Sequence, residues 1–482
     1  MNKFSKGMFT FLSVAVTIAL FSLFVASAVI WRNVQMSPEQ IRLTVCIGLG
    51  VLASGLLCFL KIKTKYKVFG ILAVGFLLRL FWTLTVPSVP VSDFLTIYHA
   101  ANGFLAGDVG ALRGYGYLAR FPHLIPMMVY MAGMIKLFGS YHIFAMKSVA
   151  LILSVITVYE IYVLSGYYVK KEISRLIAMV IAAVYPSFIT YSSTYCTETI
   201  GVPLFLLSVI LFHHAVEAEK HRWLKFLICG GVLYCSNLFR GVALIFLIAF
   251  GIYLLLFGKQ KKLGALATLV AGYFVVSVAI SSLLLVTHVI EKPLWKGSEP
   301  GFATLMLKGH NFEHYGQWNA EDAQFVEENL QNEELDKLCF AKVKERLSER
   351  TFFEIAAFYA SKFMIQWSVG DCSGMYWATM ETGVPYVYPT ARPFQGIYTV
   401  VLFLGLLGIF SREKHPPIGL MLLLLCGFGT IFMVLETQSR YAYVVNWVFI
   451  ILAAYGVDQM KFHKSMSHTH DEITQDCEVA IS

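Results

Sequence analysis

Four ionisable side chains stand at the ends of long apolar stretches of the chain. Asp93 follows the apolar run 68–84, Glu198 begins another run, and Arg240 and Arg440 each lie directly beside one. Ionisable groups at such positions are costly to place, which makes them candidates for function. A carboxylate such as Asp93 could act as a general base toward an attacking hydroxyl, and an arginine presents a fork of donors that fits a phosphate. The four residues therefore predict chemistry between a hydroxyl acceptor and a phosphate-bearing molecule.

Each of these residues also has a simpler structural interpretation. Ser92 and Asp93 would cap the helix that follows them, and Glu198 would complement the N-terminus of its own helix. The two arginines would anchor their helix ends at a lipid interface. Both interpretations stay open from these residues alone. Asp108 is a weaker candidate for chemistry, because it lies in a turn-like Gly-Asp-Val-Gly sequence.

Polar and aromatic residues gather a second time between residues 310 and 322. Tyr315 and Trp318 could stack on a sugar ring, and the polar side chains around them could bind its hydroxyls. A metal site built from His310, His314 and Asp322 would match no standard ligand spacing. An ordinary soluble loop is the competing interpretation. The candidate substrate-binding residues are Glu198, Tyr98, His99, His310 and Trp318.

The composition indicates which elements must position these side chains. The chain has 482 residues, of which 57% are hydrophobic and 14% charged. Continuous apolar runs of roughly 20 residues match the thickness of a bilayer, so we expect an all-α protein with about twelve transmembrane helices. The runs do not alternate as the strands of a β-barrel would. The expected spans are 8–31, 41–60, 68–86, 143–168, 173–190, 198–215, 223–239, 241–257, 263–287, 394–410, 417–435 and 441–457.

Basic residues cluster in every second short loop between these spans. If the N-terminus is inside, the inner loops and tail contain Lys61, Lys63, Lys65, Lys67, Lys170, Lys171, Arg175, Lys220, Arg222, Lys225, Lys259, Lys261, Lys262, Arg412, Lys414, Lys461 and Lys464. The short outer loops then contain only isolated arginines, and Asp93 lies on the outer face. The apolar segment 121–139 is expected to lie in the outer interface, because another span there would invert every later loop.

This topology divides the chain into five parts. They are an extra N-terminal hairpin (1–67), a transmembrane core (68–287) with the catalytic outer loop 87–142, a large extracytoplasmic loop (288–393), C-terminal transmembrane helices (394–457) and a cytoplasmic tail (458–482). Juxtamembrane helices are expected in both large loops. Cys339 and Cys372 fall in the same outer loop and could pair, although sequence separation does not establish the geometry.

The motifs, in their order along the chain, resemble the GT-C superfamily of integral membrane glycosyltransferases, such as protein O-mannosyltransferases and aminoarabinose transferases. The resemblance spans residues 68–457 and rests on Ser92-Asp93-Phe94 with Tyr98 and Ala101, on 121–124 running to 137–139, on Tyr185-Pro186-Ser187 with Tyr191 and Thr197-Glu198, and on Ser439-Arg440-Tyr441 leading to 453–456. It implies a polyprenyl-phosphate-linked sugar donor and an extracytoplasmic acceptor, either a protein or an envelope glycan. Asp93 would be the base, and Arg240 and Arg440 would bind the donor phosphate. A single base opposite the leaving phosphate predicts inversion.

Two departures from that family pattern bear on the mechanism. The catalytic loop follows the third span rather than the first, and Phe94 stands where many relatives carry a second acidic residue. The second departure puts a metal-assisted mechanism in doubt. The sequence therefore identifies no cofactor with certainty, and it leaves open whether the reaction uses a divalent metal.

Two other functions are compatible with the sequence. An O-antigen ligase or polymerase would rely on His310 and His314, and a transporter of lipid-linked saccharides would need several charges buried mid-span, of which only Glu160 looks deep. No Walker, GxGxxG, GxSxG or HExxH motif indicates a nucleotide or hydrolase site. The expected location is a bacterial plasma membrane, with the active site on the extracytoplasmic face. The sugar, the acceptor and the oligomeric state are left open.

Overall fold

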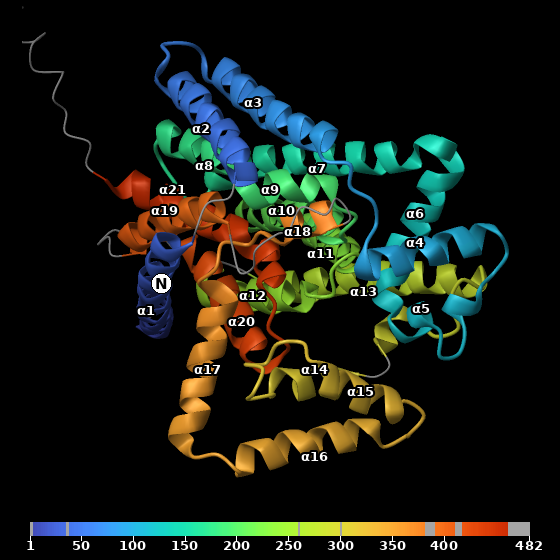
Figure 1. The fold of residues 1–482 in the computed structure, drawn as a ribbon. Helices are drawn as coiled ribbons and strands as arrows, with labels where there is room; N and C mark the ends of the chain where they lie inside the picture. Colours follow the sequence, from blue (N-terminus) through green and yellow to red (C-terminus); the bar gives the residue numbers. More distant parts are fainter. Residues whose placement is uncertain are drawn as a thin grey trace, which may run out of the picture.

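A computed structural model describes residues 3–34, 38–258, 261–298, 301–380, 391–409 and 417–460. Within these ranges the chain forms α-helices and short 3-10 helices and no strand, as the sequence predicts (Figure 1). Most of the predicted C-terminal tail and the basic residues Lys259, Arg412, Lys414, Lys461 and Lys464 lie outside the described residues.

The long apolar helices form one bundle. Its members are α1 (Lys3–Asn33), α2 (Pro38–Phe59), α3 (Thr64–Thr85), α7 (His142–Ser165), α8 (Glu172–Val184), α9 (Pro186–Thr190), α10 (Glu198–Glu217), α11 (Arg222–Asn237), α12 (Ala243–Phe257), α13 (Lys262–Val286), α19 (Arg392–Ile409), α20 (Ile418–Val434) and α21 (Asn446–Gln459), the last preceded by the 3-10 helix η7 (Ser439–Val445). Each predicted span overlaps with these helices, although 173–190 covers both α8 and α9 and 441–457 covers part of η7 with α21.

The number of helices that could cross a membrane is smaller than twelve by length and composition alone. Among the described residues eight helices qualify, and a ninth if α8 and α9, bent by 50°, count as one broken span. The helices α12 and α20 are apolar but shorter. The predicted count of twelve is therefore not established.

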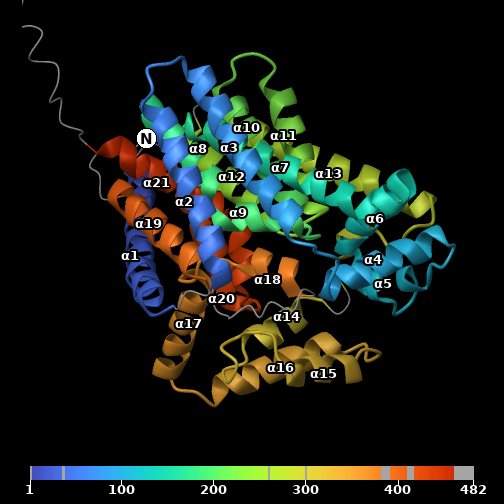
Figure 2. The same cartoon turned by 45° about the horizontal axis from the view of Figure 1, so that its top comes forward.

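The two large loops fold into helices at one end of the bundle. The first contains α4 (Ser92–Leu105), α5 (Tyr117–Arg120) and α6 (Ile125–Phe138), and the second contains α14 (Phe302–Gly309), α15 (Ala320–Glu328), α16 (Leu335–Ser348), α17 (Phe352–Trp367) and α18 (Ser373–Thr379). Figure 2 shows the α2–α3 and α10–α11 turns, which carry basic clusters, at the end opposite α14–α16. This arrangement agrees with the predicted separation of basic turns from large loops.

The helix α6 tests the prediction that residues 121–139 do not span. By composition, Pro122–Ser165 reads as one apolar stretch of 44 residues. The chain turns at Gly139, whose φ is +52°, and α6 runs across the direction of α7 (Figure 1). Left-handed backbone of this kind favours glycine. The α6 helix is thus not a straight continuation of α7, as a juxtamembrane helix requires.

Arg79 joins three helices inside the bundle at the break between α8 and α9. Its side chain is fully buried, and it donates to the carbonyl oxygens of Ala182 and Ala183 and to Ser154 Oγ. Those carbonyls belong to the last turn of α8, where Pro186 prevents the normal helical hydrogen bonds. Glu160 is buried as expected, but the expectation that only Glu160 is deep was wrong, because Arg79 is buried there too.

Close helix packing in the bundle depends on glycine. A Cβ at Gly230 on α11 would overlap the Leu269 carbonyl of α13, and a Cβ at Gly272 on α13 would overlap the Leu227 carbonyl of α11. A Cβ at Gly456 on α21 would overlap the Leu404 carbonyl of α19. Small residues of this kind let helix backbones approach closely in a membrane, where packing replaces the hydrophobic effect as the source of association.

Replacing Gly456 with alanine should separate α19 from α21. We expect Gly456→Ala to lower the apparent melting temperature of the detergent-purified protein by several degrees, because one of the two backbones must move. Gly48→Ala on α2 is the matched control, since nothing lies within 4 Å of a Cβ at Gly48. Equal melting temperatures for the two variants would contradict this account of the packing.

Candidate functional site

Asp93 lies in the first turn of α4 with its side chain exposed. The helix is not capped as predicted, because the residue at the cap position is Val91 and no side chain makes a capping hydrogen bond. Ser92 adopts a left-handed conformation with φ +51°, which costs on the order of 1 kcal/mol for a residue with a side chain. The capping interpretation of Ser92 and Asp93 was therefore wrong, and the Asp93 carboxylate is available for other contacts.

The contact that Asp93 makes is with Tyr117 on α5. The Tyr117 hydroxyl donates a hydrogen bond to the Asp93 carboxylate, and burial together with that negative charge raises the pKa of Tyr117 to about 12. Tyr117 is also close enough to Arg440 and Arg120 to interact with them electrostatically. Arg120 in turn pairs with Glu327 of α15 at 2.9 Å. Tyr117 therefore lies between Asp93 and Arg440. Arg120 links the first loop region to the second through Glu327.

Glu198, Arg240 and Arg440 meet around the ring of Tyr441. Arg240 Nη1 lies 3.4 Å from Glu198 Oε1, and the guanidinium carbons of Arg240 and Arg440 lie 4.8 Å and 5.5 Å from the centre of the Tyr441 ring. Glu198 is 1% exposed and also accepts a hydrogen bond from Thr197 Oγ1. Arg440 Nε is buried without a hydrogen-bond partner among the described residues. The structure thus brings together Asp93, Glu198, Arg240 and Arg440, with Tyr117 and Tyr441 between them.

Local structure explains why these side chains meet. Glu198 is the first residue of α10, where the helix dipole favours a carboxylate. Arg240 lies in the tight corner between α11 and α12, which is closed by a hydrogen bond from Ala243 N to Asn237 Oδ1 at 3.1 Å. Arg440 belongs to η7, the irregular lead-in to α21. Each residue therefore stands at a helix end rather than inside a helix.

Asp371 is a buried carboxyl group that the sequence reasoning missed. It lies between α17 and α18, is 2% exposed, and accepts a hydrogen bond from Ser373 N at 3.0 Å. Burial raises its pKa to about 6, although the contacts from Ser373 and the Tyr191 hydroxyl oppose that shift, and nearby Glu198 raises the pKa further. An aspartate within the largely apolar stretch 367–378 was the available signal.

Two other predicted substrate-binding residues, Tyr98 and His99, lie on α4. The Tyr98 hydroxyl is 2.9 Å from His142 Nε2 and its ring stacks on His142, so Tyr98 contacts the start of α7. His99 is exposed. The structure does not place either residue in contact with Glu198, Arg240 or Arg440, and their roles stay predictions.

The predicted sites in the second loop region have a different character. His310 is 2% exposed, and its ring nitrogens lie 2.8 Å from Met306 O and 2.9 Å from Tyr359 Oη. This geometry argues against a substrate contact for His310, because each ring nitrogen already has a protein partner. Trp318 is 57% exposed and is free to contact a ligand.

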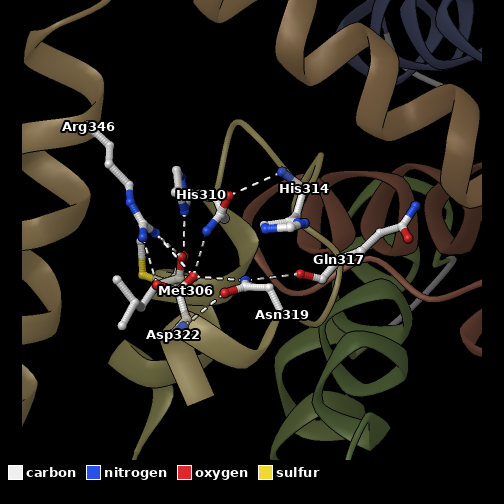
Figure 3. Close-up of polar contacts among 9 residues, drawn as sticks. Met306, His310, His314, Gln317, Asn319, Asp322 and Arg346 are labelled. Carbon is white, nitrogen blue, oxygen red and sulfur yellow. Dashed lines mark hydrogen bonds and ion pairs between the residues drawn. The ribbon is translucent and has the colours of Figure 1, made fainter. Parts of the chain in front are cut away.

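Asp322 organises this part of the second loop region (Figure 3). It is fully buried and pairs with Arg346 at 2.6 Å. Burial acts to raise the pKa of Asp322, but hydrogen bonds from Arg346, Asn319 and Asn311 hold it below its usual range. The network therefore gives Asp322 a structural role, in which it fixes the start of α15.

Two further expectations concern cysteine and metal. Cys339 and Cys372 are buried in separate hydrophobic clusters and form no disulfide with each other, so the suggested pairing was wrong. Among the described residues, no group of three or more His, Cys, Asp or Glu side chains is arranged to hold a metal ion. His310, His314 and Asp322 therefore do not form such a group.

Replacing Asp371 with asparagine should change how stability depends on pH. The carboxyl group has a pKa raised from 3.8 to about 6 in the folded protein, so its contribution is complete below pH ~4 and is lost as pH rises to ~6. We expect Asp371→Asn to gain melting temperature relative to wild type across that interval and to keep a constant difference above it. The exposed Asp336→Asn is the control. A difference between Asp371→Asn and wild type that does not vary with pH would refute the shift.

Comparison with known proteins identifies part of the chain. Residues 122–285 match the family described as dolichyl-phosphate-mannose-protein mannosyltransferase. No protein of curated function matches the sequence. Among solved structures, the oligosaccharyltransferase of Archaeoglobus fulgidus in its apo form is 14% identical, with a TM-score of 0.48, and the match covers 87% of this chain and 52% of that one.

The same archaeal enzyme, AglB, is also matched in its complex with an inhibitory peptide and a dolichol-phosphate. That structure is 14% identical with a TM-score of 0.48, and the match covers 86% of this chain and 54% of that one. The chain thus spans about half the length of these solved structures. Residues 122–285 are therefore similar to the dolichyl-phosphate-mannose-protein mannosyltransferases, which agrees with the resemblance to membrane glycosyltransferases expected from the sequence.

Proposed function

We propose that this protein is a membrane glycosyltransferase that moves a sugar from a polyprenyl-phosphate-linked donor to an acceptor hydroxyl with inversion. Asp93 acts as the general base, and Arg240 and Arg440 bind the donor phosphate. The acceptor is an extracytoplasmic protein or envelope glycan, and the site faces the outside of the membrane. The family match over residues 122–285 supports glycosyl transfer as the reaction class.

The observation that carries the proposal is the pair of guanidinium groups around Tyr441. Two arginines face a single paired carboxylate, Glu198, and Arg440 Nε is left without a hydrogen-bond partner among the described residues. An arginine fork presents parallel donors that fit the oxygens of a phosphate, as they fit those of a carboxylate. A lipid-linked donor cannot leave the bilayer, so its phosphate must be bound where helix ends meet the interface. The position of Arg240 and Arg440 at helix ends meets that requirement.

The chemistry requires charge stabilisation on one side of the sugar and a base on the other. As the glycosidic bond breaks, negative charge grows on the leaving phosphate, and fixed guanidinium groups stabilise that charge in the transition state. The acceptor oxygen forms its bond to the anomeric carbon while its proton passes to the base. Glu198 is buried and paired with Arg240, and Asp371 is buried, whereas Asp93 is exposed. Asp93 is therefore the best-placed base, with Tyr117 fixing its orientation.

The alternative functions receive less support. A ligase would rely on His310 and His314. Both ring nitrogens of His310 have protein partners, which leaves only the exposed His314 for that role. A transporter would need several unpaired charges along a path through the bundle. The buried Arg79 is engaged with carbonyl groups and Ser154, which leaves Glu160, whose Oε2 has no hydrogen-bond partner among the described residues.

Removing the Asp93 carboxylate tests the base. We expect Asp93→Asn to reduce transfer from polyprenyl-phosphate-linked sugars by at least about 100-fold, because general base catalysis contributes roughly 10²–10⁴-fold. Transfer of radiolabelled sugar to endogenous acceptors in membranes measures it. Asp108→Asn is the matched control, since Asp108 only accepts a hydrogen bond from Gly110 N in a turn, a role that asparagine preserves. Wild-type transfer by Asp93→Asn would exclude this mechanism.

Dialysis against EDTA in the same assay tests whether transfer depends on a divalent metal.

Neutralising the arginines tests the phosphate site. We expect Arg240→Gln and Arg440→Gln each to weaken binding of a polyprenyl phosphate about tenfold while leaving the neutral polyprenol unaffected, because only the phosphate contact is lost. Binding to protein in lipid nanodiscs provides the measurement. The control is Arg350→Gln in the second loop region, whose side chain packs over Phe312. Unchanged phosphate affinity in both variants would remove the donor role from these residues.

A further inference from the structure

A buried ammonium group ties the second loop region to the segment that precedes Arg440. Lys362 on α17 is 0% exposed, and its Nζ donates to Gly309 O at 2.5 Å, Met433 O at 2.8 Å and Leu435 O at 2.8 Å. Gly309 ends α14, and Met433 and Leu435 lie at the end of α20. One side chain thus joins two loop-region helices to the bundle.

Lysine suits this position for a chemical reason. The last carbonyl groups of a helix have no partner within the helix and lie at the negative end of its dipole. An ammonium group has three donors and no acceptor, so it can satisfy three such carbonyls at once. The ring of Phe358 adds a cation–π contact at 5.7 Å. Glu436, which is buried and 3.9 Å from Lys308 Nζ, supplies the nearest negative charge.

The surrounding backbone is built tightly around Lys362. Gly316 has φ +69°, and a Cβ there would stand 2.7 Å from Lys362 Cε and 2.8 Å from its Nζ. The Gly316 carbonyl accepts a hydrogen bond from Thr437 N at 2.7 Å. One turn further along α17, Gln366 exchanges two hydrogen bonds with Gln438, at 2.7 Å and 3.0 Å. Residues 433–438 are therefore held along their length by the second loop region.

We propose that Lys362 is a positioning residue that sets the place of Arg440 by holding residues 433–438, and that the second loop region thereby controls affinity for a lipid-linked phosphate. Arg440 lies two residues after the pairing of Gln438 with Gln366, at the start of η7. Any shift of residues 433–438 carries Arg440 with it. The inference rests on the proposed function, because it assigns Lys362 a role through the phosphate contact of Arg440.

Binding of a polyprenyl phosphate to the full chain in lipid nanodiscs tests the inference. We expect Lys362→Met to weaken the affinity about tenfold and to leave binding of the neutral polyprenol unchanged. The double variant Lys362→Met/Arg440→Gln should bind no more weakly than Arg440→Gln alone, since two residues that act through one contact are not additive. Lys337→Met is the control, because Lys337 is an exposed lysine of the same region that pairs with Glu334.

Hydrogen exchange gives a readout that does not depend on phosphate binding. In Lys362→Met the amides of residues 433–441 should exchange faster, while those of α10 and α13 should not change. If Lys362→Met does not fold, Gln366→Met makes the same test from the next turn of α17.

The outcomes separate this inference from the proposed function. If Arg440→Gln weakens phosphate binding and Lys362→Met does not, or if their effects add fully, the positioning role of Lys362 is overturned. If Arg440→Gln has no effect, Arg440 does not contact the donor phosphate, and the inference falls even where Arg240→Gln weakens binding.

Discussion

Carbonyl groups at helix breaks impose the constraint on which this structure depends. In apolar surroundings an unpaired backbone carbonyl costs several kcal/mol, so irregular backbone inside a bundle needs buried donors. Three buried cations supply them. Arg79 donates hydrogen bonds to the carbonyls at the end of α8, and Lys147 donates to the Val86 carbonyl, just after α3, at 2.7 Å. Lys362 donates to the carbonyls at the end of α20.

Each of these cations binds a helix end, and the segment that follows that helix end contains a candidate functional residue. The chain continues from the Val86 carbonyl to Asp93, from the end of α8 to Glu198, and from the end of α20 to Arg440. A continuous helix could not present three such groups at one end of the bundle, because its side chains point along its flanks. Breaking the helices and satisfying the broken ends therefore allows the polar site to form beside an apolar core.

The sequence predicted much of this arrangement because its strongest signals are local. Apolar runs located the long helices of the bundle, and the basic turns predicted which ends of the helices share a side. The outward arginines and Glu198 were found because charge beside an apolar run is rare. The cap at Ser92 and the pairing of Cys339 with Cys372 failed for a different reason. Each depends on which neighbour a side chain meets, and spacing along the chain does not contain that information.

The sequence by itself therefore determined an all-helical membrane protein, its GT-C resemblance and the four charged residues at helix ends. Only the tertiary structure decided that Tyr117 bridges Asp93 toward Arg440, that Asp371 lies near Glu198, and that Lys362 holds the segment leading to Arg440. The physical reason is the range of the interactions. An apolar run is recognised from residues that are neighbours in the sequence. A buried charge is instead stabilised by partners that folding brings from more than 50 residues away, as the contacts of Lys362 with Gly309, Met433 and Leu435 show.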